Sequence, residues 1–306
     1  MSMALDIAGW RKLSLPELSG LAVAQKLASR GSKVSLCSII NAKSGKCSED
    51  CRFCVQSSHY ATGTPVYPLK EAAEVLAAAR EAASIGATRF SLVTSGRGPS
   101  WVELGRIARL VEAIRAEVPI QVCASLGILD REGFLLLKEA GVSRYHHNLE
   151  SSREYFPQVA TTHTFAERVA TIRAAQEAGL EVCAGGIFGL GESEDDRISL
   201  ALSLLELSVD SVPLNVLIPL PGTPLAGMAP LSVAEIIRSL ALFRLILPEV
   251  PIRLAAGRES ALGDFLGLAF MAGADGMMIG GYLTQRGRLP QADQRFISEI
   301  SRIWTT

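Results

Sequence analysis

The sequence lacks the features that would place the protein in a membrane or on nucleic acid. No stretch approaches the roughly 18 uninterrupted apolar residues of a membrane span, and Met1 to Arg11 contain no basic segment followed by an apolar run. The formal net charge is -1, and no block of like charge forms a basic footprint. We therefore expect small-molecule partners, no nucleic acid, no membrane and a cytoplasmic location.

Cysteine and histidine are also scarce, with six and four copies in 306 residues. In a reducing cytoplasm, irregularly spaced cysteines are more often metal ligands or buried thiols than disulfides. The hydrophobic content of 48% is nevertheless high enough to bury a large core. We expect a single domain over residues 1–306, with an N-terminal helical extension over about residues 1–32.

One short loop contains half of the cysteines: Cys47, Cys51 and Cys54, spaced C-x3-C-x2-C, with no fourth cysteine or histidine. A structural zinc site needs four ligands, commonly from two separated pairs, so this loop fits zinc poorly. Cysteine thiolates also hold iron–sulfur clusters, and three thiolates on four irons leave one iron open to an outside molecule. The spacing therefore favours an open iron–sulfur cluster over three unrelated buried thiols.

Strand-like and helical segments alternate along the rest of the chain. The predicted strands are 34–40, 89–94, 120–125, 143–149, 180–188, 212–217, 252–256 and 276–279. The predicted helices are 69–84, 101–116, 130–140, 165–178, 194–207, 233–245, 260–272 and 292–303, after an additional N-terminal helix over 14–29. Such alternation demands parallel pairing and predicts the α/β class, as a closed (β/α)8 TIM-type barrel. A doubly wound open sheet is the competing fold.

Alternate residues of the predicted strands form an apolar face and a polar face. The apolar face should meet the helices, so the other face points to the barrel axis. It carries Ser35, Cys37, Ser91, Cys123, Asn148, Glu150, Cys183, Asn215 and Arg253. A barrel centre normally fills with branched apolar side chains, whereas buried thiols, amides and a guanidinium need partners. The barrel centre is therefore predicted to be a site, entered where the cysteine loop leaves the first strand.

The cysteine loop resembles that of the radical S-adenosylmethionine (SAM) enzymes, whose open iron binds the amino and carboxylate groups of SAM. The flanking segments, Asn41-Ala42-Lys43-Ser44-Gly45 and Val55-Gln56-Ser57-Ser58-His59-Tyr60, narrow the resemblance to the biotin synthase family. The similarity extends over about residues 30 to 285. It implies that a reduced [4Fe-4S] cluster on Cys47, Cys51 and Cys54 cleaves SAM to methionine and a 5'-deoxyadenosyl radical. That radical removes hydrogen from dethiobiotin, and an auxiliary cluster donates the sulfur that completes biotin.

The resemblance also implies SAM-binding residues. Glu150 matches the residue at the SAM ribose hydroxyls, where most relatives have aspartate, and Arg168 matches the arginine that pairs with the SAM carboxylate. A bidentate guanidinium suits a carboxylate, although Arg168 could instead be a solvated helix charge. Gly185 and Gly186 match a segment beside the adenosyl group, although glycines at strand ends often mark turns alone.

For the substrate, the resemblance assigns Asn148 and Asn215 to the ureido ring of dethiobiotin. A side-chain amide supplies both a donor and an acceptor, which suits a cyclic urea. The adjacent His146 and His147 could suggest zinc, but neighbouring strand residues point to opposite faces and chelate poorly together.

Cys123, Cys183 and Arg253 resemble the family's auxiliary-cluster ligands, including its unusual arginine. The sequence departs from the family at Ser91, where many members have a cysteine, and at Cys37, an extra thiol on the preceding strand. Neighbouring strands lie about 4.8 Å apart. We therefore expect Cys37 to replace the missing thiol, and we favour a four-iron over a two-iron auxiliary cluster. The alternative is that Cys37 is packing and Ser91 ligates through oxygen.

Two other functions remain open on these patterns. Another radical SAM barrel enzyme, such as a hydrogenase-cofactor maturase or methylornithine synthase, fits the loop but not Cys123, Cys183 and Arg253 together. A non-catalytic iron–sulfur carrier would not need polar residues along the barrel axis. The family resemblance further implies a small electron-transfer protein of the flavodoxin or ferredoxin type and a homodimer.

Overall fold

The computed structural model describes residues 5–284 and 287–305, and their strands form one sheet with parallel pairing throughout. The strand order is β5-β4-β3-β2-β1-β9-β8-β7-β6. The two ends of that order, β5 (Glu181–Cys183) and β6 (Gly186–Phe188), are separated in the chain by Ala184 and Gly185 alone. The sheet therefore closes on itself, which confirms the predicted (β/α)8 barrel.

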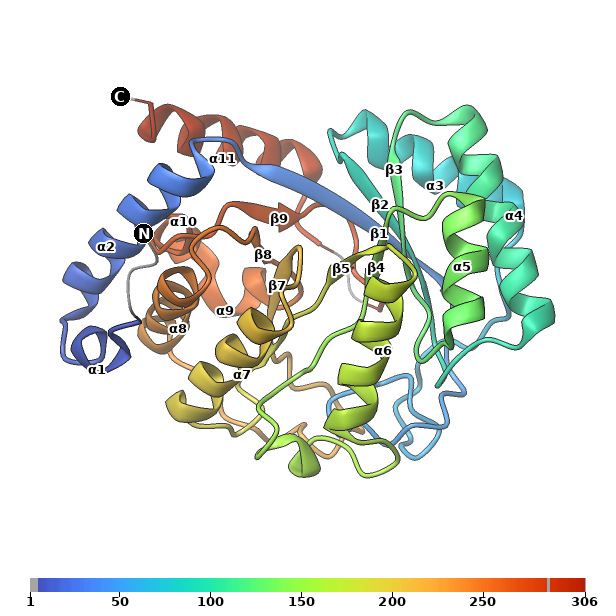
Figure 1. Cartoon of the computed structure of the whole chain (residues 1–306), viewed down its shortest axis with the longest axis horizontal. Helices are drawn as coiled ribbons and strands as arrows, with labels where there is room; N and C mark the ends of the chain where they lie inside the picture. Colours follow the sequence, from blue (N-terminus) through green and yellow to red (C-terminus); the bar gives the residue numbers. More distant parts are fainter. Residues whose placement is uncertain (1–4, 285–286, 306) are drawn as a thin grey trace.

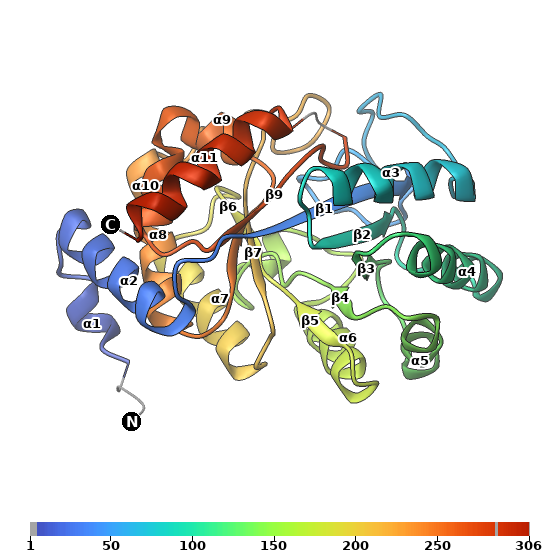
Figure 2. The ribbon, with the colours of Figure 1, turned by 90° about the horizontal axis from the view of Figure 1, so that it is seen from above.

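The elements follow the predicted alternation (Figures 1 and 2). The remaining strands are β1 (Ser35–Lys43), β2 (Arg89–Thr94), β3 (Gln121–Ser125), β4 (Arg144–His146), β7 (Val212–Val216), β8 (Ile252–Leu254) and β9 (Gly276–Met278). The helices between and after them are α3 (Ala72–Ser84), α4 (Trp101–Glu117), α5 (Arg131–Ala140), α6 (Phe165–Glu177), α7 (Glu194–Glu206), α8 (Val233–Ile246) and α11 (Pro290–Ile303).

Local signals in the sequence account for where several helices begin and end. The capping boxes of α6 (Thr164 with Glu167) and α8 (Ser232 with Glu235) are present, so free backbone N–H groups at these helix starts are satisfied. α5 ends at Gly141, whose φ of 105° lies in the left-handed region that glycine tolerates. These boundaries are encoded locally and were predictable.

Two predicted strands are shorter or interrupted. The run 180–188 is split into β5 and β6 at Ala184 and Gly185, and a Cβ at Gly185 would lie 1.9 Å from the Pro213 carbonyl oxygen, so only glycine fits there. The run 143–149 forms a strand only over Arg144–His146, and the chain beyond it bridges β6 at Glu150 and Gly186. Both departures occur where the barrel closes.

The predicted helix 260–272 is also interrupted. It consists of α9 (Arg258–Leu262), the 3-10 turn η2 (Gly263–Phe265) and α10 (Leu266–Met271). Gly263 follows α9 with a φ of 48°, which ends regular α-helical geometry at that point. A helical hydrophobic pattern does not reveal such a break.

The N-terminal extension consists of α1 (Ile7–Trp10) and α2 (Leu15–Arg30), and α2 packs against α8 and α10. The end of α2 lies at the amino ends of the strands, because Ser29 Oγ donates to the Pro248 carbonyl (2.5 Å) and Arg30 pairs with Asp275 (3.4 Å). The ammonium group of Lys26 also lies 3.0 Å from the centroid of the Trp304 ring. The helix therefore covers the end of the barrel opposite the predicted entrance.

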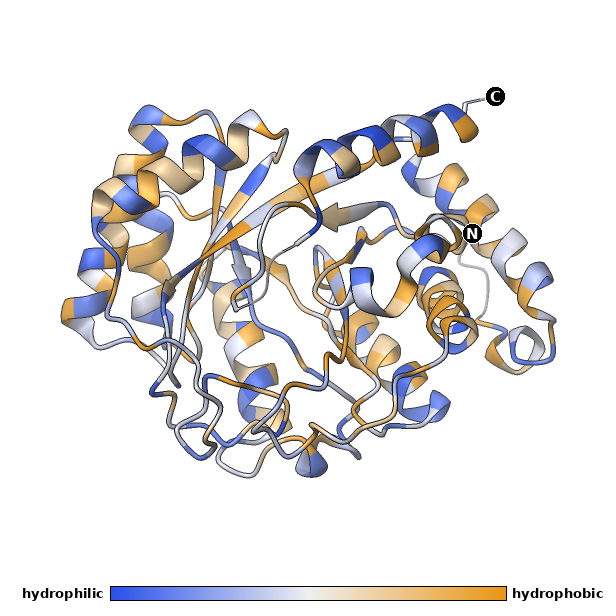
Figure 3. Ribbon diagram, turned by 180° about the vertical axis from the view of Figure 1, so that it is seen from behind, coloured by the Kyte–Doolittle hydropathy of each residue, from blue (hydrophilic) through white to orange (hydrophobic). Residues whose placement is uncertain are grey.

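The main hydrophobic core lies between the strands and the surrounding helices. On α5, for example, Phe134 and Leu137 are buried, whereas Arg131 and Lys138 are exposed. Figure 3 shows hydrophilic and hydrophobic residues alternating along the outer helices, as expected for amphipathic helices on a barrel. Within the described part of the chain, no helix has the length and apolar character needed to cross a membrane.

Candidate active site

The barrel encloses a cavity of about 370 Å³. Except for Ser35, every side chain predicted to face the barrel axis lines it: Cys37, Ser91, Cys123, Asn148, Glu150, Cys183, Asn215 and Arg253. Cys54 of the cysteine loop lines the same cavity. The polar phase of the strands was therefore predicted correctly, and one continuous space connects two groups of cysteines.

The cluster loop, residues 47–54, is shaped by backbone and side-chain hydrogen bonds. The Cys47 N–H donates to the Gln56 carbonyl (3.0 Å), and the Cys54 N–H donates to the Cys51 carbonyl (2.9 Å). The Gln56 side-chain oxygen accepts from the Gly45 N–H (3.3 Å) and the Ser44 hydroxyl (3.1 Å). Lys46, just before the first cysteine, adopts a left-handed φ of 50°. These contacts hold the entrance to the loop in a tight turn.

The cysteines of the loop are free thiols in the described chain. Burial raises the pKa of Cys54 to about 11 and raises that of Cys51 as well. Thiolate is the form that binds iron, and a bound cation supplies the charge that stabilises it. Three cysteines in one loop, with no fourth cysteine or histidine among residues 47–54, suit a cluster with one open iron.

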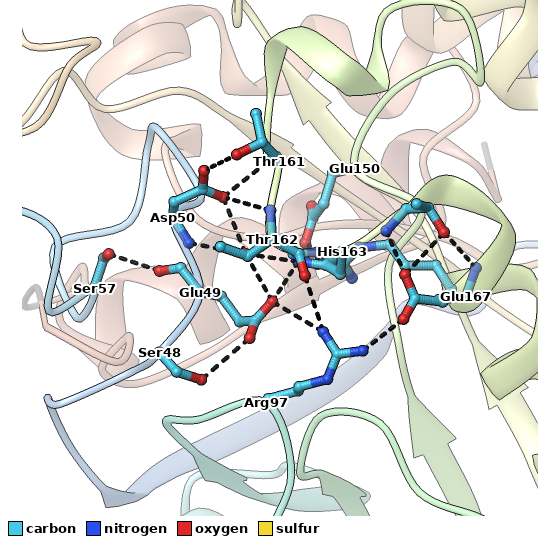
Figure 4. A network of polar contacts seen from close by, with 12 residues as sticks. Ser48, Glu49, Asp50, Ser57, Arg97, Glu150, Thr161, Thr162, His163 and Glu167 are labelled. Carbon is cyan, nitrogen blue, oxygen red and sulfur yellow. Dashed lines mark hydrogen bonds and ion pairs between the residues drawn. The ribbon is translucent and has the colours of Figure 1, made fainter.

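Two acidic residues between the cysteines fasten the loop to the segment before α6 (Figure 4). The Asp50 carboxylate accepts from the Thr161 N–H (2.8 Å), the Thr162 N–H (3.1 Å) and the Thr161 hydroxyl, and it shares the single Thr162 O–H with Glu49. Glu49 accepts from the Thr162 hydroxyl (2.8 Å) and from Nδ1 of His163 (2.6 Å). The loop position is therefore determined by contacts more than one hundred residues away in the chain.

Arg168 lies on the first turn of α6, and its guanidinium contacts the segment that follows β4. Its Nη1 donates to the Asn148 carbonyl (2.7 Å) and lies 3.9 Å from the Glu150 carboxylate. Burial raises the pKa of Glu150, while the nearby Arg168 guanidinium opposes that increase. Glu150 itself has a left-handed φ of 69°, which is unusual for a residue with a side chain. The two residues predicted to contact SAM are thus brought together.

Asn148 and Asn215 are each held by a pair of hydrogen bonds. The Asn148 oxygen accepts from the Gly185 N–H (3.1 Å), and its amide nitrogen donates to Glu150 (3.2 Å). The Asn215 oxygen accepts from the Ala256 N–H (3.0 Å), and its nitrogen donates to the Gly186 carbonyl (3.1 Å). Each amide retains one N–H and one lone pair for a ligand, so both can bind a cyclic urea without losing their supports.

Gly185 and Gly186 have packing reasons to be glycine. A Cβ at Gly186 would lie 2.5 Å from the Glu150 carbonyl oxygen, and Gly185 is crowded by Pro213 as described above. Neither residue belongs to the cavity lining. The glycines let the strands approach closely, and their backbone groups hydrogen-bond the Asn148 and Asn215 side chains. In this way they help to position the cavity-lining amides.

At the inner end of the cavity, Cys37, Ser91, Cys123, Cys183 and Arg253 form what we call the inner site. Burial raises the pKa of both the Cys37 and Cys123 thiols. Cys183 lies near both thiols, and its charge, when deprotonated, would raise the pKa of each further. Burial disfavours the charge of Arg253, but its pKa is raised overall by the negative charge that the neighbouring Cys37 and Cys183 carry when deprotonated.

The strand register places the two unusual residues of the inner site at different depths. Ser91 pairs with Cys123 on β3, whereas Cys37 pairs with Arg89 on β2, nearer the amino ends of the strands. The Ser91 hydroxyl and the Nε atom of Arg253 are buried without a hydrogen-bond partner among the described residues. Thiols together with unpaired hydrogen-bond donors suit an iron–sulfur cluster, whose irons take thiolates and whose sulfides accept hydrogen bonds.

Sequence reasoning missed two arginines beside the inner site. Arg89 and Arg144 line the cavity and share the Glu181 carboxylate, at 2.9 Å and 2.8 Å. Arg89 also lies 3.9 Å from Cys123 Sγ, and Arg144 Nη1 is buried with no partner in the described chain. Their positions in the strand alternation were a usable signal, since Arg89 shares the phase of Ser91.

The adjacent histidines occupy separate environments. His146 lines the cavity, and burial lowers its pKa to about 4, so it is neutral near pH 7. The His147 ring stacks near Tyr145, with 6.4 Å between ring centroids, and burial lowers its pKa as well.

Solved structures resemble this fold closely at low sequence identity. Methylornithine synthase matches with a TM-score of 0.79 at 21% identity, covering 99% of this chain and 93% of its own. The FeFe-hydrogenase maturase HydG from Carboxydothermus hydrogenoformans also gives 0.79, at 22% identity, covering 99% of this chain and 74% of its own. At such identity the likeness shows the barrel fold alone.

Comparison with sequence relatives identifies the family, which the structural comparison does not. Residues 42–204 match the radical SAM superfamily, and residues 213–301 match the biotin and thiamin synthesis associated domain. The chain is 49% identical to a biotin synthase of Pelotomaculum thermopropionicum, over 97% of this chain and 92% of the relative. It is 50% identical to one of Thermotoga neapolitana, over 90% of this chain and 98% of the relative. The chain belongs to the biotin synthase family, radical SAM enzymes that use a [4Fe-4S] cluster and SAM to insert sulfur into dethiobiotin.

Proposed function

We propose that this chain forms biotin in its single barrel cavity, with the cluster loop at one end and the inner site as sulfur donor at the other. The observation that supports this is the continuous cavity lined by both Cys54 and the inner-site thiols. The bound clusters and SAM supply radical formation and sulfur. The chain itself binds and orients the reacting molecules and excludes water, which a closed barrel achieves well.

At the cavity entrance, Cys47, Cys51 and Cys54 would hold the [4Fe-4S] cluster. Arg168 would pair with the SAM carboxylate, and Glu150 would accept hydrogen bonds from the ribose hydroxyls. The 3.9 Å separation of Arg168 and Glu150 supports this assignment, because one molecule can reach both. Gly185 and Gly186 would permit the close strand approach that borders the adenosyl group.

Asn148 and Asn215 would bind the ureido ring of dethiobiotin between the two clusters. Both line the cavity, and both are fixed by backbone hydrogen bonds that leave donor and acceptor capacity free. A preorganised amide loses little conformational freedom on binding, which favours both affinity and alignment.

In the inner site, Cys37, Cys123, Cys183 and Arg253 would ligate the auxiliary cluster, which we propose to be a four-iron cluster. Cys37 lies beside Arg253 and Cys183, as a ligand of the same cluster should. Cys37 lies nearer the amino ends of the strands than Ser91 does, so a ligand set that includes Cys37 spans a greater length of the barrel axis. Ser91 would then act as a hydrogen-bond donor to the cluster.

The ligand set is tested by iron and sulfide analysis with Mössbauer spectra on wild type, Cys37→Ala and Ser91→Ala. We expect Cys37→Ala to lose the auxiliary iron and biotin formation while the cluster loop keeps its iron. Ser91→Ala should keep both clusters. If Cys37→Ala keeps full auxiliary iron and makes biotin while Ser91→Ala loses both, the assignment is wrong and serine is the ligand.

The overall reaction is tested by anaerobic reconstitution with iron, sulfide, SAM, a reductant and dethiobiotin. Methionine, 5'-deoxyadenosine and biotin are the expected products. A non-catalytic carrier would yield none of them, and another radical SAM barrel enzyme would yield the first two with a different substrate.

For its cellular setting, we propose a cytoplasmic homodimer reduced by a small flavodoxin- or ferredoxin-type protein. The few, irregularly spaced cysteines support a reducing compartment, where such residues are more often ligands or buried thiols than disulfides. We also propose one structural domain, since strands from both family-matched segments pair within one sheet.

A further inference from the structure

His163 lies between the cluster loop and Arg168. Its Nδ1 is 2.6 Å from the Glu49 carboxylate, on the loop between Cys47 and Cys51. Its Nε2 accepts from Arg168 Nε (3.2 Å) and Nη2 (2.9 Å). The imidazole is 5% exposed and packs edge-on against Phe156, with 5.5 Å between ring centroids. Figure 4 shows His163 beside Thr162, within the network that Glu49 joins.

These partners determine the tautomer of His163. The guanidinium of Arg168 can only donate hydrogen bonds, so Nε2 must be the unprotonated nitrogen. The Glu49 carboxylate can accept from Nδ1–H, so the proton resides there. Each ring nitrogen therefore has a single role, and the ring orientation is fixed from both sides.

The hydrogen bonds of Arg168 show what this arrangement does for the guanidinium. Arginine has five N–H donors. The Nε–H and one Nη2–H go to His163, and one Nη1–H goes to the Asn148 carbonyl. One N–H remains on each terminal nitrogen, so the guanidinium keeps two donors for a carboxylate.

We propose that His163 is a positioning residue that sets the terminal nitrogens of Arg168 relative to the cluster loop. This rests on the proposed role of Arg168 at the SAM carboxylate. The SAM carboxylate must reach both the guanidinium and the open iron, so the distance between loop and arginine matters. The chain Glu49–His163–Arg168 connects these two partners through two successive hydrogen-bonded contacts.

Loop anchoring alone does not account for His163. Asp50 and Thr162 fasten the loop without it, and Glu49 also accepts from the Thr162 hydroxyl. Thr162→Val is therefore a matched control, because it removes loop hydrogen bonds and leaves the Arg168 contacts in place.

The test uses two variants that each preserve half of the link. His163→Asn places an amide near the Nδ1 position, so it can donate to Glu49 but does not reach Arg168. His163→Gln places an amide oxygen near the Nε2 position, so it can accept from Arg168. The dissociation constants of SAM and of decarboxylated SAM are measured on anaerobically loaded protein, with iron content as a separate readout.

We expect His163→Asn to weaken SAM binding about tenfold, as for loss of a hydrogen bond to an ionised group. His163→Gln should stay within about threefold of wild type. Decarboxylated SAM should bind His163→Asn and wild type equally, because it lacks the group that Arg168 recognises. Thr162→Val should lower iron retention without this ligand selectivity.

Equal SAM affinity of His163→Asn and wild type would overturn the proposal. So would a His163→Asn variant that loses as much affinity for decarboxylated SAM as for SAM. A His163→Gln variant that loses as much SAM affinity as His163→Asn would overturn it as well. Arg168→Met separates this failure from that of the underlying assignment. If Arg168→Met weakens SAM binding while His163→Asn does not, the positioning role alone is wrong. If Arg168→Met has no effect, the assignment of Arg168 and the positioning role both fail.

Discussion

The cluster loop and the inner site each contain three cysteines, and Cys54 of the loop lines the same cavity as all three inner-site cysteines, but the protein around the two sites differs. At the loop, Glu49, Asp50, Thr162 and His163 satisfy one another through a continuous hydrogen-bond network. At the inner site, the Ser91 hydroxyl, Arg144 Nη1 and Arg253 Nε are buried without hydrogen-bond partners in the described chain.

This difference indicates that protein hydrogen bonds shape the cluster loop, whereas the inner site keeps buried polar groups that need a bound partner. The loop geometry is supported by protein contacts that do not involve the cysteine side chains, so its shape should persist when a ligand changes. The inner site instead combines thiols with Arg89, Arg144 and Arg253, opposed by the carboxylate of Glu181. Buried donors without partners are costly, so the inner site depends on what binds there.

The largest expected effect comes from removing a cysteine of the cluster loop. Cys51→Ala should abolish SAM cleavage, because three thiolates are needed to hold the cluster with one open iron. The barrel should remain folded, since the anchors of the loop are intact. Production of 5'-deoxyadenosine measures cleavage, and circular dichroism with a thermal melt checks the fold. Continued 5'-deoxyadenosine formation would refute the loop assignment.

Arg144→Met should affect the inner site selectively. Removing a guanidinium close to Cys37 and Cys123 takes away positive charge that favours their thiolates. Loss of one nearby unit charge should speed release of auxiliary iron to a chelator on the order of tenfold. Iron in the cluster loop should be released at the wild-type rate. Equal acceleration at both sites would remove the distinction between them.

Asn215→Ala should have a smaller effect, confined to the substrate. A buried hydrogen bond contributes about 0.5–1.5 kcal/mol, so dethiobiotin binding should weaken about two- to tenfold. SAM binding should change less, because Asn215 contacts the Gly186 and Ala256 backbone rather than Arg168 or Glu150. Equilibrium binding of both ligands decides this, and equal losses would show that Asn215 is not specific for substrate.

The smallest expected effect concerns the pH dependence of the loop region. Hydrogen bonds from the Thr164 backbone and side chain lower the pKa of Glu167, which also pairs with Arg97. A lowered folded-state pKa stabilises the fold above the ordinary carboxyl pKa of about 4.3, and this stability is lost as pH falls below it. Glu167→Gln should reduce, by a few tenths of a kcal/mol, the free energy of unfolding that is lost between neutral and acid pH. Thermal melts over a pH series measure this loss. An unchanged profile would show that this carboxylate contributes nothing.

Local and periodic signals account for much of what the sequence determined. The C-x3-C-x2-C spacing, the capping boxes at Thr164 and Ser232 and the inward phase of Cys123 and Cys183 follow from short-range chemistry and strand geometry. A side chain's phase depends only on its own strand. For that reason the lining of the cavity was predictable before any strand was paired.

Other features arise only when distant segments meet. The need for glycine at position 185 comes from the nearby Pro213 carbonyl, and the shared Glu181 carboxylate unites Arg89 with Arg144. No sequence pattern specifies which distant partner a hydrogen-bonding side chain will reach.

His163 illustrates the division most directly. From sequence it is one histidine before a capped helix, with no recognisable motif of its own. Barrel closure brings it within hydrogen-bonding distance of Glu49, 114 positions earlier in the chain, and α6 presents Arg168 to its other nitrogen. The sequence by itself determined the barrel and which strand side chains face its cavity, because periodicity is local. Tertiary structure decided the contacts between loop and arginine, because they depend on how separate strands and helices pack.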